Sequence, residues 1–163
     1  MNKPTSPYLL NLLGNSTITK AEVLAAQQGW GNGIVEIGKA DNAKKAAMKH
    51  LKTFYGFDYG TVLFKPTLAS VKQFRGTEKE ALSYFIGDDL TEDNGFALAP
   101  YTNVYWENKD IIITANTALA MGNYFFTKAD GETIKVEYSF AYFKDTNDNL
   151  RINLHHSSLP YQP

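Results

Sequence analysis

Residues 149–161, NLRINLHHSSLPY, hold two of the chain's three histidines, His155 and His156, followed directly by Ser157 and Ser158. Imidazole gains and loses a proton near neutral pH, and hydroxyl groups both donate and accept hydrogen bonds. Four interpretations are open for these residues. They form a metal site, a nucleophile with its base, a metal-free acid–base pocket, or only the polar end of a strand.

A histidine-ligated zinc site is disfavoured. Such a catalytic site needs three protein ligands, and the chain has no cysteine and only one further histidine, His50. Neighbouring residues of a strand point to opposite faces, so His155 and His156 should not bind one ion. His50 is expected to be a half-buried residue among apolar neighbours of a helix. A carboxylate site for a hard cation stays open, although no compact acidic motif is present. We therefore predict neither a metal nor another cofactor.

A serine hydrolase is disfavoured as well. The chain has no G-x-S-x-G motif. Neither Ser157 nor Ser158 follows a strand-to-helix turn of the kind that exposes a nucleophile. A metal-free pocket or a structural strand end remains.

Alternation predicts which of the four residues face the pocket. Apolar residues recur at every second position of 150–154, so they share one strand face. That face continues to His156 and Ser158, which we expect at a pocket. His155 and Ser157 fall on the opposite face, toward solvent or a subunit interface. A β-bulge near the strand end would exchange the two sets.

The first half of the chain predicts helices around one short strand. Thr19 with Glu22, and Thr77 with Glu80, form capping boxes that start two helices. The glycines of residues 29–33 break the first helix or mark a close backbone approach. Two further elements are predicted: a helix over 42–57 capped by Asp41, and a strand over 60–67 ended by Pro66.

From residue 101 onward the sequence predicts a meander of long antiparallel strands, with a hairpin turn at Asp130-Gly131. Helices followed by strands are typical of an α+β domain. A curved sheet packed on a few helices forms a cone, with a pocket between the two layers. We expect one domain over residues 1–163, with an irregular lead-in at residues 1–16.

Composition restricts the partners. The 163-residue chain has a formal net charge of -1, so no field attracts it to nucleic acid. No apolar run approaches the roughly 20 residues of a membrane span. Aromatic residues make up 13% and suggest a ring-lined core or pocket. We expect a cytoplasmic protein, or a periplasmic one if a leader was removed.

Several motifs resemble a known family. The run NVYWENKDIIITANTALAMGNYFFTKADGE and the later LRINLHHSSLP resemble the association domain of calcium/calmodulin-dependent protein kinase II, a member of the NTF2-like superfamily. VLFKPT, FRGTEKEALSYFIG and HHSSLP narrow this resemblance to the iota-class carbonic anhydrases of bacteria and algae. It covers residues 19–161. It implies an NTF2-like cone, hydration of CO2 to bicarbonate, a homodimer and, in the cyanobacterial type, no metal.

The expected active site combines this resemblance with the strand pattern. Thr67 at the end of the short strand and Tyr84 on the third helix are expected to reach the cavity that holds His156 and Ser158. His156 would act as base or proton shuttle. The three hydroxyl groups would orient water and hold the developing bicarbonate.

Three further residues are candidates for contacts to the substrate, namely Tyr124, His155 and Ser157. The alternative for Tyr84 and Tyr124 is core packing with the hydroxyl at the rim. Lys65 and Arg75 are expected to be surface charges, although either could attract bicarbonate.

Two other functions stay open. The chain could be a non-catalytic association or small-ligand-binding module whose outer sheet face builds oligomers. It could also be an NTF2-like isomerase or dehydratase, for which Asp58 is the nearest candidate base. A metal-independent carbonic anhydrase is the main hypothesis.

Overall fold

The computed structural model describes residues 16–163, so the predicted lead-in lies almost wholly outside the described residues. Within these residues, three α-helices and two short 3-10 helices precede or flank the strands. The helical elements are α2 (Lys20–Lys39), α3 (Ala43–Phe54), η1 (Phe57–Tyr59), α4 (Glu78–Ile86) and η2 (Phe96–Leu98). The strands are β1 (Leu63–Lys65), β2 (Tyr101–Thr114), β3 (Thr117–Lys128), β4 (Thr133–Lys144) and β5 (Leu150–Ser158).

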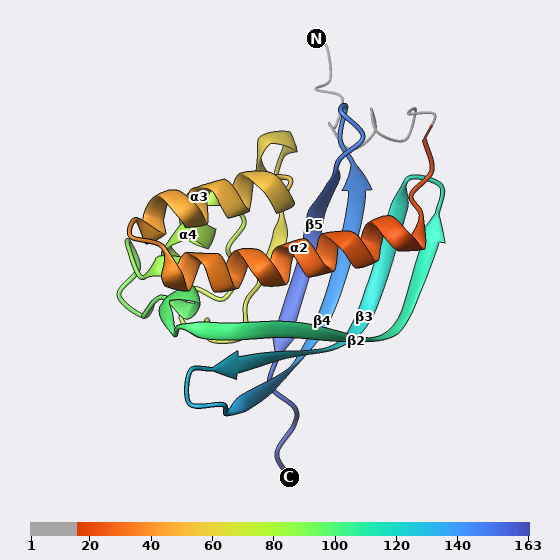
Figure 1. Ribbon diagram of the computed structural model, residues 1–163. Helices are drawn as coiled ribbons and strands as arrows, with labels where there is room; N and C mark the ends of the chain where they lie inside the picture. The colour runs from red at the N-terminus through yellow and green to blue at the C-terminus, as the bar shows by residue number, and fades with distance from the viewer. Residues whose placement is uncertain (1–15) are drawn as a thin grey trace.

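The strands form one sheet in the order β1-β5-β4-β3-β2. β2 to β5 are an antiparallel meander, and β1 pairs in parallel with β5. The sheet is curved, and the helices lie over one of its faces, with α2 running across the strands (Figure 1). This arrangement confirms the predicted α+β fold. Within residues 16–163, no helix is both long and apolar enough to cross a membrane.

The glycine-rich segment does not break α2, which continues to Lys39. The alternative interpretation, a close approach, is correct. A Cβ on Gly31 would lie 3.1 Å from the Cβ of Val104 in β2, and a Cβ on Gly33 would lie 2.2 Å from Nδ1 of His50 in α3. The glycines therefore let α2 pack closely on both the sheet and α3.

The helix caps follow the sequence closely. Both predicted capping boxes are present, at Thr19 and at Thr77. The cap of α3 is Asn42 rather than the expected Asp41; its side chain accepts a hydrogen bond from the Lys45 amide. α4 ends at Gly87, whose φ of 70° is a left-handed conformation that glycine adopts without strain.

A bulge in β5 reverses the predicted orientation of its last residues. The β4–β5 register shifts between the pairs Ala141–Leu154 and Tyr142–Ile152, so Asn153 is an extra residue. Beyond it, the inward positions are His155 and Ser157, each 3% exposed, while His156 is exposed. The prediction that His156 and Ser158 face the pocket was wrong, because alternation holds only while the register is regular.

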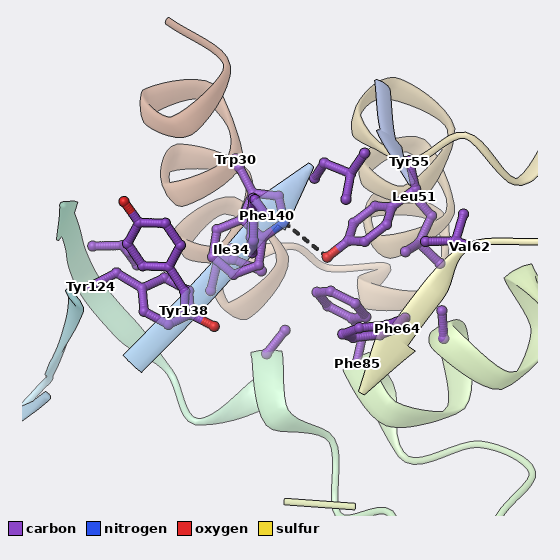
Figure 2. Close-up of a cluster of buried hydrophobic side chains, with 14 of the residues drawn as sticks. Trp30, Ile34, Leu51, Tyr55, Val62, Phe64, Phe85, Tyr124, Tyr138 and Phe140 are labelled. Atoms are coloured by element: carbon purple, nitrogen blue, oxygen red, sulfur yellow. Dashed lines mark hydrogen bonds between the residues drawn. The ribbon is translucent and has the colours of Figure 1, made fainter. Parts of the chain in front are cut away.

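The core between the sheet and the helices is largely aromatic. Trp30 of α2 packs against rings from β2, β3, β4 and β5. Figure 2 shows Trp30 with two of these rings, Tyr124 and Phe140. Aromatic rings of this size bury much apolar area and keep their orientation. The core is therefore a rigid wall on which a polar site can be fixed.

Candidate active site

A cavity of about 160 Å³ lies between the sheet, including the end of β1, and the helix α4. Its walls are mostly aromatic and aliphatic, with a few polar groups among them. The lining residues are Trp30, Phe64, Pro66, Thr67, Leu68, Tyr84, Phe85, Phe96, Tyr101, Tyr124, Phe126, Ile134, Val136, His155, Ser157 and Leu159.

Five of the seven predicted site residues line this cavity: Thr67, Tyr84, Tyr124, His155 and Ser157. They come from four places in the chain, namely the end of β1, α4, β3 and β5. Only the fold brings them together. Tyr84 and Tyr124 belong to the buried core and also line the cavity, so the alternative of core packing with the hydroxyl at its rim fits their position as well.

His156 and Ser158 do not line the cavity. They face a shallow depression on the other side of the sheet, beside Met121 and Ser139. The Ser158 hydroxyl donates to Glu137 Oε2 at 3.1 Å. The bulge at Asn153 is the physical reason, because it moves both side chains to the outer face.

Both ring nitrogens of His155 are held by tyrosine hydroxyls. Nδ1 lies 2.9 Å from Tyr55 Oη, and Nε2 lies 3.1 Å from Tyr124 Oη. The imidazole also stacks on Phe64, with ring centroids 4.7 Å apart. These contacts fix the position and plane of the ring.

The pKa of His155 lies well below its ordinary value, because burial penalises the charged imidazolium. No cavity-lining residue within 16–163 is a carboxylate that could offset this effect. The imidazole is therefore neutral at neutral pH. The base role expected for a solvated histidine does not fit this position.

The hydroxyl groups form a second small network. Thr67 Oγ1 donates to Ser157 Oγ at 2.9 Å. The Leu68 amide donates to Tyr84 Oη at 3.4 Å, which leaves the phenol proton of Tyr84 for another acceptor. Burial raises the pKa values of the Tyr84 and Tyr124 phenols, so both groups stay protonated donors.

An ion-pair cluster holds the loop that carries Thr67 and Leu68. Arg75 is fully buried and binds both carboxylate oxygens of Asp93, at 2.7 and 2.8 Å. Glu92 accepts hydrogen bonds from the backbone amides of Ser70, Val71 and Lys72. These amides lower the pKa of Glu92 to about 2.

The surface position expected for Arg75 was therefore wrong. Its guanidinium joins the loop after β1 to the segment after α4. It does not line the cavity, so it makes no direct contact with a molecule bound there.

Two other predicted candidates lie outside the cavity. Asp58 is exposed on η1 and faces a separate surface depression. His50 is more buried than expected, at 4% exposure, and packs among rings such as Trp30, Phe54 and Phe85. Within residues 16–163, no group of three or more His, Cys, Asp or Glu side chains could hold a metal ion.

Sequence reasoning missed Tyr55. It follows α3 directly, and its partner His155 is 100 residues away in the chain. A tyrosine that ends a helix among apolar residues carries no local signal of such a contact. Only the packing of α3 on β5 reveals it.

Comparisons with known proteins give a consistent result. A family model described as metal-independent carbonic anhydrase matches residues 21–159. A metal-independent carbonic anhydrase of Nostoc sp. (strain PCC 7120 / SAG 25.82 / UTEX 2576) is 47% identical over 158 residues, which cover 91% of this chain and 77% of that protein.

Two solved structures are similar to the whole chain or most of it. A crystal structure of the iota-carbonic anhydrase from a cyanobacterium, complexed with bicarbonate, has a TM-score of 0.89 and 41% identity over 100% of both chains. A protein of Xanthomonas campestris, described as a calcium/calmodulin-dependent protein kinase II association domain, has a TM-score of 0.61 and 20% identity, covering 90% of this chain and 91% of that one. The second likeness concerns the fold alone and confirms the predicted NTF2-like architecture.

Proposed function

The chain belongs to the family of metal-independent carbonic anhydrases, and we propose that it hydrates CO2 in the cavity lined by Thr67, Tyr84, Tyr124, His155 and Ser157. The observation that carries this proposal is the position of these polar groups. They meet in one apolar hollow of a carbonic anhydrase fold, where CO2 and water can react.

The cavity suits a small apolar substrate and its reaction partner. A single water needs about 10–15 Å³ of such space, so about 160 Å³ holds CO2 together with water. The apolar walls receive the uncharged CO2 molecule. The hydroxyl groups bind the water and the oxygens on which charge develops.

The hydroxyl network supplies a route for the proton. The attacking water gives a proton to Thr67, Thr67 gives its own to Ser157, and Ser157 protonates an oxygen of CO2. The new bond joins the water oxygen to carbon, while one carbon–oxygen double bond becomes single. The product is carbonic acid, which releases one proton after reaching solvent and becomes bicarbonate.

This route keeps the cavity neutral throughout. A charge buried among aromatic rings without a partner is costly, so a relay of hydroxyl groups is favoured over a histidinium intermediate. Tyr84 and Tyr124 donate to the substrate oxygens as their electron density increases. Because burial keeps the pKa of His155 well below its ordinary value, kcat/KM for CO2 should not change between about pH 6 and 8.

A stopped-flow assay of CO2 hydration tests the function. The protein is dialysed against a chelator, and its metal content and circular dichroism are measured before the assay. We expect a rate proportional to protein concentration and no inflection near pH 6.5. A folded, metal-depleted protein that does not exceed the buffer rate would rule the function out. An inflection of the kcat/KM profile near pH 6.5 would contradict the hydroxyl relay and indicate a solvated histidine base.

We also propose a homodimer formed through the outer face of the sheet. Ile112, Leu119 and Met121 are 46–59% exposed on that face, and Tyr105 stacks on Phe125 at 4.5 Å. An apolar surface on neighbouring strands is typical of an interface. Light scattering should give twice 18.2 kDa for the protein and 18.2 kDa for Leu119→Glu. A monomeric native protein at micromolar concentration would refute the dimer.

A further inference from the structure

A line of hydrogen bonds connects the cavity to the deep core. Trp30 Nε1 donates to Tyr55 Oη at 3.0 Å, a contact visible in Figure 2. Tyr55 Oη contacts His155 Nδ1, and His155 Nε2 contacts Tyr124 Oη. All four side chains are at most 3% exposed. Only Tyr55 among them does not line the cavity.

The chemistry of the first member sets the direction of this line. An indole N–H donates and never accepts, so Tyr55 Oη must accept from Trp30. The remaining Tyr55 proton then points to His155 Nδ1. The structure shows no other acceptor for this proton among residues 16–163. His155 Nδ1 is consequently an acceptor, and the single imidazole proton resides on Nε2.

We propose that Trp30 and Tyr55 are positioning residues that fix the Nε2–H tautomer of His155. In this tautomer Nε2–H donates to Tyr124 Oη, and the Tyr124 proton is directed into the cavity, where Ser157 and a bound molecule can accept it. In the opposite tautomer Nε2 would accept the Tyr124 proton and withdraw it from the substrate. The contact between the two core residues thus determines whether Tyr124 is a donor in catalysis. This role rests on the proposed function of the cavity.

The same line cannot carry protons away from the substrate. It ends at an indole that cannot accept a proton, and its members are buried. The line of hydrogen bonds therefore orients Tyr124 but does not conduct protons. Protons exchanged during turnover must therefore pass through the cavity mouth beside Leu68 and Leu159, which are 63% and 54% exposed.

The test uses Tyr55→Phe, which removes one oxygen and keeps the ring. Long-range ¹H–¹⁵N correlation spectra of protein with ¹⁵N-labelled histidine report the tautomer directly. His50→Gln and His156→Gln variants assign the signals. We expect the Nε2–H form in the native protein and a substantial Nδ1–H population in Tyr55→Phe. The kcat should fall about 10-fold or more, a loss typical of residues that orient a functional side chain without touching the substrate. The KM should change little.

Tyr142→Phe is the matched control. Tyr142 is also a buried tyrosine, but its hydroxyl lies near Gln27 and makes no hydrogen bond to any member of the line. This variant should keep both the tautomer and kcat. An Nδ1–H tautomer in the native protein would overturn the proposal, as would a Tyr55→Phe protein with a shifted tautomer and unchanged kcat. A native protein without CO2 hydration would refute the function, whereas the spectra would still decide the tautomer.

Discussion

At the scale of single residues, Thr67 should matter through its hydroxyl alone. It is the donor to Ser157 and the first acceptor in the proposed relay. Thr67→Val keeps the shape and removes the hydroxyl, so kcat/KM for CO2 should fall about 10²-fold. Thr67→Ser keeps the hydroxyl and should stay within about threefold of the native value. Stopped-flow hydration assays measure both variants. Equal activities of Thr67→Val and Thr67→Ser would exclude a role for the Thr67 hydroxyl.

Residue types were easier to predict than residue orientation. The cluster of two histidines and two serines lies on a strand end that reaches the cavity, and Thr67, Tyr84 and Tyr124 line the same cavity, as expected. The prediction that His156 and Ser158 face the cavity was wrong, because the extra residue at Asn153 depends on how β5 pairs with β4. Nothing within the strand's own sequence specifies that pairing.

At the scale of elements, the buried ion pair should hold the loop between β1 and α4. Arg75→Met leaves Asp93, whose side chain is 1% exposed, as a buried charge without its partner. Loss of one partner in such a pair typically costs about 3–5 kcal/mol. Urea unfolding should show a loss of this size.

Lys79→Met is the matched control for Arg75→Met. Lys79 pairs with Asp89 at 3.2 Å on the surface, where its side chain is 79% exposed. Exposed pairs contribute about 0–1 kcal/mol. Similar losses for the two variants would show that the Arg75 cluster is no more important than a surface pair.

Helix starts were predictable from local sequence, whereas helix packing was not. The capping boxes of α2 and α4 need only residues three positions apart. The continuation of α2 through its glycines depends on His50 and Val104 filling the space that side chains would occupy. Arg75 also appeared to be a surface charge, because its partners lie 17 and 18 positions away.

At the scale of the whole molecule, acid should weaken the fold before its carboxylates are protonated. Burial lowers the pKa of His50 to about 3 and that of His155 well below its ordinary value. The unfolded chain takes up protons near pH 6.5, and the folded chain does not. Stability is therefore complete above about pH 6.5 and is lost as pH falls, by up to about 1.4 kcal/mol per pH unit for each histidine.

Urea unfolding at several pH values between about 5 and 7 measures this effect. His50→Gln should reduce the slope of the unfolding free energy against pH by about the contribution of one histidine. An unchanged slope would mean that His50 binds its proton equally in the folded and the unfolded state.

The overall architecture itself was predictable, because strand spacing and the order of helices and strands indicated an α+β cone.

The central claim is that the inner face of β5 carries the chemistry and the outer face does not. The most direct test compares kcat/KM for CO2 of Ser157→Ala and Ser158→Ala, made in the same chelator-treated background. Ser157 is in the cavity and Ser158 is one position further along, on the opposite face. We predict a loss of about 10²-fold for Ser157→Ala and less than about twofold for Ser158→Ala. Equal losses, or a larger loss for Ser158→Ala, would contradict the account.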